Sequence, residues 1–424
     1  MKVSIHAFKE KIIRHTLCFM LFFIAFTTYA NAYVKNDFRQ FKGKVFDEVT
    51  KQPLELVHLF IQHSNINTVT NSEGEFLLKV PLDLVSKNVT VTHLGYVSKV
   101  IPISEFNTDN NKIYLKASAI QLADINLENL KDAEGLVKSV FKNKSDNYLD
   151  KNSVMTAFYR ETIKKGKKNV SLSEAIVNIY KTPYSSVKED VLEFHKSRKN
   201  TNYSKLDTLA LKLQGGPFNT LFVDMVKYPD YIFSEETIED YNFSFNYSTK
   251  MDNKLIYVIN FTPKYVDKSL FYEGQLFIDY QNKILTGANY ALNLSNKREA
   301  QEFFAVKKPS SSSVTPTKAD YQVKYIEKDG EWHYGYSKIS LDFKVNWRRK
   351  IFNSNYSMSC EMAVTDLKED VVAMPKLKDR IRKTVVMTDY KSGFSDTNFW
   401  GSHNIIEPDK SIEKAIKKIQ KQLE

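Results

Sequence analysis

Two hydrophobic patterns divide the chain. Up to about residue 116, short apolar stretches alternate with turn signals, which is typical of a small β-sandwich. One such signal is Asn71-Ser72-Glu73-Gly74, a tight turn whose glycine can take a positive φ. The strands predicted here are residues 41–47, 54–62, 67–70, 75–80, 89–92, 97–103 and 113–116. Residues 117–131 continue the β pattern.

From Val154 to about residue 365, long stretches alternate strictly between apolar and polar residues and are rich in Tyr, Phe, Val and Ile. A period of two predicts a large, mostly antiparallel sheet with one buried and one polar face. We interpret its aromatic residues as core and cross-strand packing and not as a ligand-stacking surface. Residues 307–318 are rich in Ser and Pro and predict a loop. The clearest strands are 241–248, 255–262, 270–279, 284–294, 321–326, 332–347 and 356–364.

Two segments have the period of an amphipathic helix. Residues 132–148 place Leu136, Val137, Val140 and Phe141 on one face. Residues 409–423 place four lysines opposite an apolar face made of Ile412, Ala415, Ile416, Ile419 and Leu423. The predicted fold is therefore mainly β: a seven-stranded N-terminal sandwich, then a large antiparallel β-domain with a few helices. The predicted divisions are a leader at 1–32, the sandwich at 33–118, a linker strand and amphipathic helix at 119–152, the large β-domain at 153–406 and the C-terminal amphipathic helix at 407–424.

The first of these divisions has the features of a secretory signal peptide. Four basic residues precede an apolar run at residues 17–26, and Ala30-Asn31-Ala32 fits a cleavage site. The alternative is an uncleaved anchor, but a bilayer span needs about 20 apolar residues. Cys18 follows a leucine and not a small residue, so it does not fit a lipidation site. We predict cleavage after Ala32 and export to the periplasm or the periplasmic face of the outer membrane, with secretion as a further possibility.

Removing this leader changes the charge and the cysteine count. The full chain of 424 residues has 61 basic and 50 acidic side chains, a net charge of +11. Without residues 1–32 these numbers become 57 and 49, a net charge of +8. One cysteine then remains, Cys360, which excludes an intramolecular disulfide. It lies in an alternating stretch, so we interpret it as a buried small hydrophobic residue and not as a reactive thiol.

The N-terminal strands and turns resemble a known family. The matching segments, in order, are Gly43-Lys-Val-Phe-Asp47, Gln52-Pro-Leu54, Val69-Thr-Asn-Ser-Glu-Gly-Glu-Phe76, Val91-Thr-His-Leu-Gly-Tyr96 and Ile113-Tyr-Leu115. They are similar to the carboxypeptidase-like regulatory domain of exported Bacteroidetes-type proteins. The resemblance implies a transthyretin-like sandwich, an accessory unit and not the catalytic one. Further segments are similar to parts of exported proteins that carry this domain, a group without an assigned activity. These segments are residues 157–161, 173–175, 213–217, 224–227, 274–279, 399–400 and 404–408.

Motifs that would supply enzyme chemistry are absent from the sequence. There is no H-E-x-x-H or H-x-H zinc motif, no phosphate-binding glycine loop and no G-x-S-x-G elbow. We interpret Gly215-Gly216-Pro217 as a turn or the end of a short helix. No catalytic, cofactor-binding or metal-binding residue is therefore assigned, and no cofactor is expected.

Charged residues suggest two other features. The alternating stretches contain Arg160, Glu161 and Glu174, which we expect to form a polar network inside the sheet. We interpret this network as an ion pair that specifies the fold and only secondly as a functional site. Basic runs at 164–168, 348–350 and 380–383 and in the final helix account for the positive charge. For the run at 164–168 we favour a solvated hairpin tip, with contact to anionic lipid or lipopolysaccharide as the alternative. Without a recognition module, no nucleic-acid partner is expected.

These observations favour a non-enzymatic exported protein that binds or assembles an envelope component. Recognition would use a sheet edge or a concave face, with an envelope protein or a glycan as partner. One alternative is a hydrolase built from distant residues, with His195, His333 or His403 as acid or base. Another is an outer-membrane β-barrel, against which the basic terminal helix counts. The sheet-with-helix pattern is also similar to that of lipoprotein-carrier half-barrels.

Overall fold

The structure is a computed structural model. It describes residues 37–118, 132–202, 215–234, 236–251, 254–265, 270–304, 312–348, 353–371, 373–385, 387, 392–396 and 398–423. The predicted signal peptide lies outside these residues, and so does all but the start of the predicted strand at 117–131. The fold is mainly β, as predicted.

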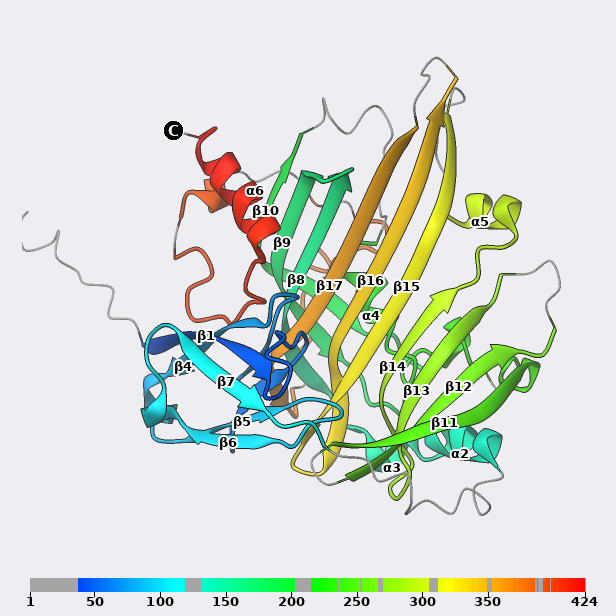
Figure 1. The fold of residues 1–424 in the computed structure, drawn as a ribbon, viewed down its shortest axis with the longest axis horizontal. Helices are drawn as coiled ribbons and strands as arrows, with labels where there is room; N and C mark the ends of the chain where they lie inside the picture. Colours follow the sequence, from blue (N-terminus) through cyan, green and yellow to red (C-terminus); the bar gives the residue numbers. More distant parts are fainter. Residues whose placement is uncertain are drawn as a thin grey trace, which may run out of the picture. The chain divides into compact units, whose positions relative to one another are not determined.

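The N-terminal part is a seven-stranded sandwich, which confirms the predicted fold (Figure 1). One sheet has the order β4-β1-β7, with β1 and β7 parallel, and the other has the order β3-β2-β5-β6. Apolar residues from both sheets, such as Val45, Leu59, Leu78 and Val91, are fully buried between them. The strands are β1 (Phe38–Asp47), β2 (His58–Ile61), β3 (Asn67–Val69), β4 (Glu75–Pro81), β5 (Asn88–Thr92), β6 (Lys99–Pro102) and β7 (Asn111–Leu115).

The second part is a single antiparallel sheet of ten strands in the order β10-β9-β8-β17-β16-β15-β14-β13-β12-β11. The last strand, β17, pairs with the first, β8, in the interior of the sheet. On one side of this pair lie β9 and β10, and on the other side lie β16 to β11 in reverse chain order. The strands are β8 (Ser153–Lys165), β9 (Lys168–Lys181), β10 (Val191–Thr201), β11 (Tyr241–Met251), β12 (Lys254–Pro263), β13 (Tyr272–Asp279), β14 (Ile284–Leu292), β15 (Ser312–Lys328), β16 (Glu331–Trp347) and β17 (Ser354–Glu369).

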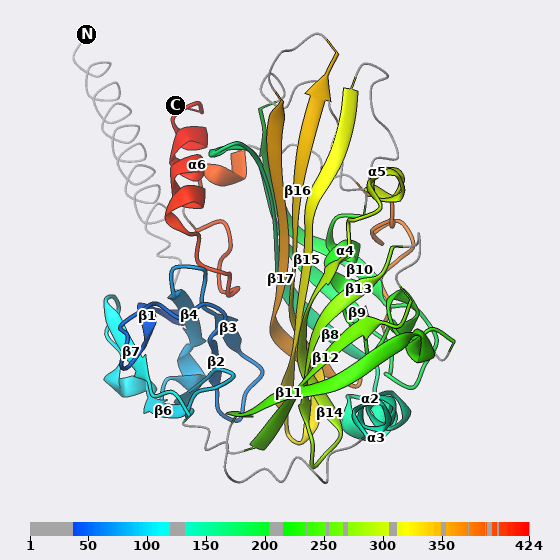
Figure 2. The same cartoon turned by 45° about the vertical axis from the view of Figure 1, so that its right-hand side comes forward.

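The two faces of this sheet are covered differently (Figure 2). On the helical face, α2 (Ala133–Lys142) and α4 (Pro217–Leu221) pack on Ala157, Val177 and other inward residues to form the main core. On the opposite face, here called the sandwich face, Phe158 and Ile176 pack against the sandwich and the C-terminal segment 399–406. Alternation along each strand sends neighbouring residues to opposite faces. Where the sandwich packs, both faces are buried. Elsewhere the predicted polar face is present: Ser340, Asp342 and Lys344 of β16 are half-buried or exposed and alternate with buried residues of the main core.

The remaining helices are short. They are α3 (Lys144–Asn147), α5 (Lys297–Phe304) and α6 (Lys410–Gln420). The predicted N- and C-terminal helices are confirmed, and Asp132 and Asp409 cap them by accepting hydrogen bonds from Gly135 N and Ile412 N. Because α6 ends at Gln420, Leu423 is exposed and does not extend its apolar face. Within the described residues, no helix combines the length and apolar character needed to cross a membrane.

The loop predicted at 307–318 is wrong in its second half. β15 already begins at Ser312, and Val314 and Pro316 point to buried positions. A proline removes one ladder hydrogen bond, but here the register shifts between Pro316 and Lys318, so the strand tolerates it. The serine-rich composition therefore hid an alternating pattern.

Two predicted turns are confirmed. Residues 164–168 form the tip of the β8–β9 hairpin, with Gly166 at φ 58°. Gly215 and Gly216 also have positive φ and turn the chain, but they precede a helix and do not end one. Pro217 occupies the first turn of α4, a position where its missing N–H costs nothing.

Candidate binding cavity

The predicted ion pair between Arg160 and Glu174 is present and buried on the sandwich face. Arg160 Nε donates to Glu174 Oε1 at 2.8 Å, and Arg198 lies 2.6 Å from the other oxygen. Burial alone would raise the pKa of Glu174, but the two arginines outweigh it and the pKa is lowered. Arg160 Nη2 also donates to the carbonyl oxygen of Ile406, 2.8 Å away. The cluster therefore fastens the C-terminal segment to the sheet.

Glu161 was wrongly included in this network. It follows Arg160 on β8, so its side chain points to the helical face, where it accepts a hydrogen bond from Tyr159 at 2.9 Å. Burial raises its pKa. Arg198, which sequence reasoning missed, lies directly across from Glu174 in the register of β9 and β10.

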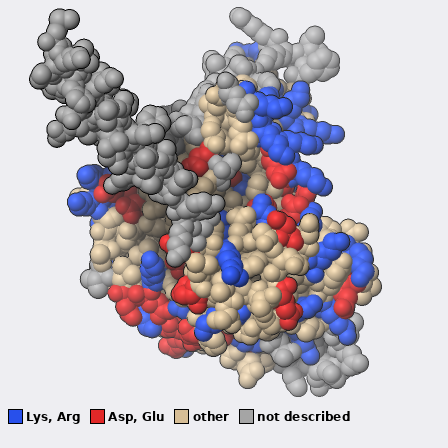
Figure 3. Space-filling view, turned by 90° about the vertical axis from the view of Figure 1, so that its left-hand side faces the viewer, with Lys and Arg blue, Asp and Glu red and all other residues tan. Residues whose placement is uncertain are grey.

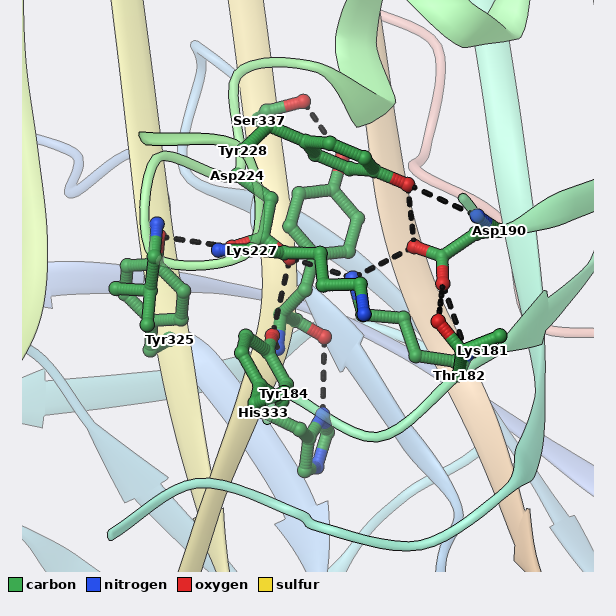
Figure 4. Close-up of polar contacts among 12 residues, drawn as sticks. Lys181, Thr182, Tyr184, Asp190, Asp224, Lys227, Tyr228, Tyr325, His333 and Ser337 are labelled. Atoms are coloured by element: carbon green, nitrogen blue, oxygen red, sulfur yellow. Dashed lines mark hydrogen bonds and ion pairs between the residues drawn. The ribbon is translucent and has the colours of Figure 1, made fainter. Parts of the chain in front are cut away.

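A second buried ionic cluster lies on the helical face and was not predicted (Figure 4). Lys181, at the end of β9, lies 2.8 Å from Asp190 and 2.6 Å from Asp224. Asp224 also accepts hydrogen bonds from Tyr184 and Tyr325, each at 3.0 Å. All three charged side chains are fully buried.

The surroundings complete this cluster. Asp190 accepts hydrogen bonds from Tyr228 and from the backbone and hydroxyl of Thr182. Burial alone would lower the pKa of Lys181, but the two carboxylates outweigh it and the pKa is raised. Lys227 donates to two backbone carbonyls in the adjacent turn. Since each charged group is already paired, the cluster fixes the chain around residues 182–228 and leaves no group free to act on a substrate.

The three histidines proposed as acid or base do not assemble into one site. His195 and His403 are neighbours, with ring centroids 5.0 Å apart, whereas His333 is buried on β16 with Nδ1 2.9 Å from the carbonyl oxygen of Tyr334. Burial lowers the pKa of both His333 and His403 to about 4. Within the described ranges, no hydrogen bond joins any of these three rings to a carboxylate or hydroxyl group. Cys360 is buried as predicted, and burial raises the pKa of its thiol.

A cavity of about 590 Å³ lies between the sandwich and the sandwich face of the large sheet. The sandwich contributes residues 53–56, 58, 60, 69 and 92–94, and the sheet contributes Met251 of β11 and residues from β13 to β16. Most of the wall is apolar, including Leu54, Phe60, Leu94, Phe277, Ile326 and Trp332. The helical face, by contrast, is filled by the main core. The cavity therefore lies on the sandwich face of the sheet and not on the helical face.

Apolar contacts between sandwich and sheet surround the cavity on two sides. On one side Leu56 and Val69 pack with Phe158 and Tyr336. On the other, Leu94 packs against the cluster of Ile256, Val258 and Phe277. These contacts hold the two walls at a fixed separation, so the space between them is a feature of the packed fold.

The basic and acidic residues of the cavity lining are one lysine, two histidines and three carboxylic acids: Lys324, His58, His93, Glu55, Glu327 and Asp329. Lys324 Nζ donates to the carbonyl oxygen of Leu56 at 3.0 Å, and no carboxylate among the described residues forms an ion pair with it. Burial lowers its pKa to about 8, which the charge of Glu55 partly opposes. Burial lowers the pKa of His58 to about 4 and of His93 to about 3. At neutral pH Lys324 therefore carries its charge and both imidazole rings are neutral.

Each imidazole already has a partner in the sandwich. His58 Nε2 lies 3.1 Å from Asn67 Oδ1, and His93 Nδ1 lies 2.8 Å from the carbonyl oxygen of Leu94. The sequence did not single out Lys324, His58 or His93 for this site. The only local signal was a lysine within an alternating strand, and that pattern equally fits a solvated face.

Comparison with known proteins supports the sandwich assignment. Residues 41–127 match the family model described as a CarboxypepD_reg-like domain, which confirms the predicted resemblance for that part of the chain. No curated protein matches the chain.

Several solved structures have some likeness to the chain. A putative outer membrane lipoprotein-sorting protein domain from Vibrio parahaemolyticus is 10% identical, with a TM-score of 0.25, over 57% of this chain and 94% of that one. A LolA superfamily protein from Nitrosomonas europaea is 11% identical, with a TM-score of 0.24, over 56% and 94%. A DUF1329 family protein from Desulfovibrio piger is 11% identical, with a TM-score of 0.24, over 57% and 94%. Scores this low carry no inference about function.

Proposed function

We propose that this protein is a non-enzymatic binding protein of the bacterial envelope, and that its cavity takes a mostly apolar ligand with one acidic group. The observation that carries the proposal is Lys324, which forms no ion pair with a carboxylate among the described residues and lies in the wall of a mostly apolar cavity. A half-buried cation without an ion-pair partner has lost part of its hydration, and an anionic group would offset that cost.

The size and chemistry of the cavity define the ligand class. A volume of about 590 Å³ falls within the range of roughly 300–1,000 Å³ that small-molecule sites occupy. The apolar wall suits a hydrocarbon chain or ring system, and Lys324, with a pKa of about 8, carries its charge at neutral pH. A carboxylate at the end of an acyl chain fits both demands.

The alternative of a hydrolase receives less support. His58 and His93 are neutral and already hydrogen-bonded in the folded sandwich, so neither is poised to exchange a proton with a ligand at neutral pH. Other charged groups in the two buried clusters are paired with one another. Binding without turnover is therefore the function that this geometry favours.

The cellular setting of the proposal comes from the sequence. The predicted leader at residues 1–32 and the resemblance to exported Bacteroidetes-type proteins support a location of the mature chain in the periplasm or on the periplasmic face of the outer membrane. The sandwich at 33–118 and the β-domain at 153–406 then act together, because each contributes one wall of the cavity. An envelope protein that delivers or receives the ligand is the partner that this role requires.

Binding of a fluorescent fatty acid tests the proposal. The chain without residues 1–32 is titrated with cis-parinaric acid and, separately, with its methyl ester. Lys324→Met should weaken binding of the acid by about ten- to a hundredfold, because it removes a charge-assisted hydrogen bond, and should leave the ester unchanged. Asn289→Trp, at an exposed position in the cavity wall, should weaken both.

Lys338→Met is the matched control, since Lys338 lies on the neighbouring strand β16 and does not line the cavity. It should bind both probes like the unchanged chain. Failure of either probe to bind, or equal loss with Lys338→Met and Lys324→Met, would overturn the proposal.

A further inference from the structure

Two basic segments that are far apart in the sequence lie next to each other. The tip of the β8–β9 hairpin, residues 164–168, has four lysines, of which Lys167 and Lys168 are exposed. Directly after this tip, Asn169 Nδ2 donates to the carbonyl oxygen and the hydroxyl of Ser411 in the first turn of α6, both at 3.0 Å. This contact places the hairpin tip beside the start of the lysine-rich helix.

The apolar face of α6 is already used. Ile412 and Ile419 are buried against Leu172 of β9 and Phe394. Its lysines therefore all lie on the outward surface, and those at 414, 417, 418 and 421 are exposed. A helix seated in this way cannot turn its apolar side into a membrane, but it presents a fixed row of ammonium groups to whatever lies outside.

These ammonium groups have few internal partners. Lys410 pairs with Glu73 at 3.5 Å, whereas none of the lysines at 414, 417, 418 and 421 forms an ion pair with a described carboxylate. Glu413 is the one acidic residue between Lys410 and Gln420. Figure 3 shows Lys and Arg side chains gathered toward the upper right of the face in view, so positive charge is spread unevenly over the surface.

We propose that the hairpin tip at 164–168 and the outward face of α6, together called the basic surface, dock the protein on a bilayer containing anionic phospholipid. The charges project from a hairpin and a helix and do not line a cleft, which suits an extended anionic plane better than a small anion. Each lysine near such a plane strengthens binding about fivefold. Because no apolar residue inserts, the contact is electrostatic, reversible and weakened by salt.

Vesicle co-sedimentation tests the basic surface. The chain without residues 1–32 is used, because an apolar leader would bind lipid by itself, and the compact unit Arg39–Glu424 stays intact. The probes are equimolar phosphatidylcholine–phosphatidylglycerol vesicles and pure phosphatidylcholine vesicles. We expect binding to the anionic vesicles alone, lost at high salt. The triple variant Lys414→Gln, Lys417→Gln, Lys418→Gln should bind at least about tenfold more weakly.

A matched variant controls for net charge. Lys99→Gln, Lys112→Gln, Lys116→Gln removes the same three charges from exposed positions on the sandwich and should bind like the unchanged chain. Thermal unfolding of both variants shows that each is folded. A second triple variant, Lys164→Gln, Lys167→Gln, Lys168→Gln, should also weaken binding if the surface is continuous. Equal binding to neutral vesicles, equal loss in the sandwich variant, or binding to duplex DNA without binding to vesicles would each overturn the proposal.

Discussion

Arg160 of β8 donates a hydrogen bond to the carbonyl oxygen of Ile406, a residue 246 positions later in the chain. Two residues before Ile406, the side chain of Asn404 accepts a hydrogen bond from the backbone N–H of Lys79 in β4, at 2.7 Å. The C-terminal segment is therefore a strap that is hydrogen-bonded to the large sheet on one side and to the sandwich on the other.

Replacing Arg160 should loosen this strap. Arg160→Met leaves Glu174 with one arginine in place of two, and leaves the Ile406 carbonyl without its donor. Breaking a buried ion pair in this way costs about 3–5 kcal/mol of the free energy of unfolding. Urea unfolding measures that loss, and limited proteolysis should find new cleavage around residues 399–409.

Arg298→Met serves as the comparison, because that side chain is 91% exposed on α5 and its loss should cost no more than about 0.5 kcal/mol. If Arg160→Met unfolded at the same urea concentration as Arg298→Met, the strap would not depend on the buried cluster.

The cluster on the helical face makes a separate prediction. Asp224→Ala removes the acceptor shared by Lys181, Tyr184 and Tyr325 and leaves a buried ammonium with a single carboxylate partner. We expect a loss of about 3–5 kcal/mol in the free energy of unfolding. Asp230→Ala, a few residues away and exposed, should change it by less than about 0.5 kcal/mol. A small effect at Asp224 would show that water or a rearranged loop replaces the carboxylate.

Stability should fall in mild acid because of buried histidines. Burial lowers the pKa of His333 from 6.5 to about 4. Between these values the unfolded chain binds a proton that the folded chain does not, so the free energy of unfolding decreases as the pH drops. One such group contributes a slope of about 1.4 kcal/mol per pH unit. Urea unfolding from pH 7 to pH 4 measures the slope.

His333→Gln removes this titration and should flatten the slope, while His58, whose pKa is also lowered to about 4, keeps part of it. An unchanged slope in His333→Gln would mean that His333 titrates normally and that its site is open to water.

Local patterns were sufficient to predict most strands. A period of two is visible within a single strand, so β11 to β14, β16 and β17 follow from the sequence alone. The same alternation explains the error at Glu161: neighbours in a strand face different cores, so Arg160 and Glu161 cannot belong to one network.

Interactions between distant segments were beyond such patterns. The cluster combines Lys181 at the end of a strand, Asp190 just before β10 and Asp224 in a turn, and nothing in the sequence around each residue marks them as partners. The cavity is even harder to predict from the sequence, because Leu56 and Lys324 come into contact only when the sandwich packs on the sheet. The position of Lys324 in a cavity wall cannot be inferred from the sequence of its strand, because the polar face of that strand is expected to be exposed to water.

The placement of the cavity between two walls links ligand binding to folding. A molecule bound there contacts residues 53–60 of the sandwich and 322–327 of the sheet at once, so it favours the state in which the two are packed together. At a free concentration a hundred times its dissociation constant, such a ligand adds about 2.7 kcal/mol to the free energy of unfolding. The ligand-free and the ligand-bound protein would then differ in how stably the sandwich packs on the sheet. A partner protein that separates the sandwich from the sheet would release the ligand.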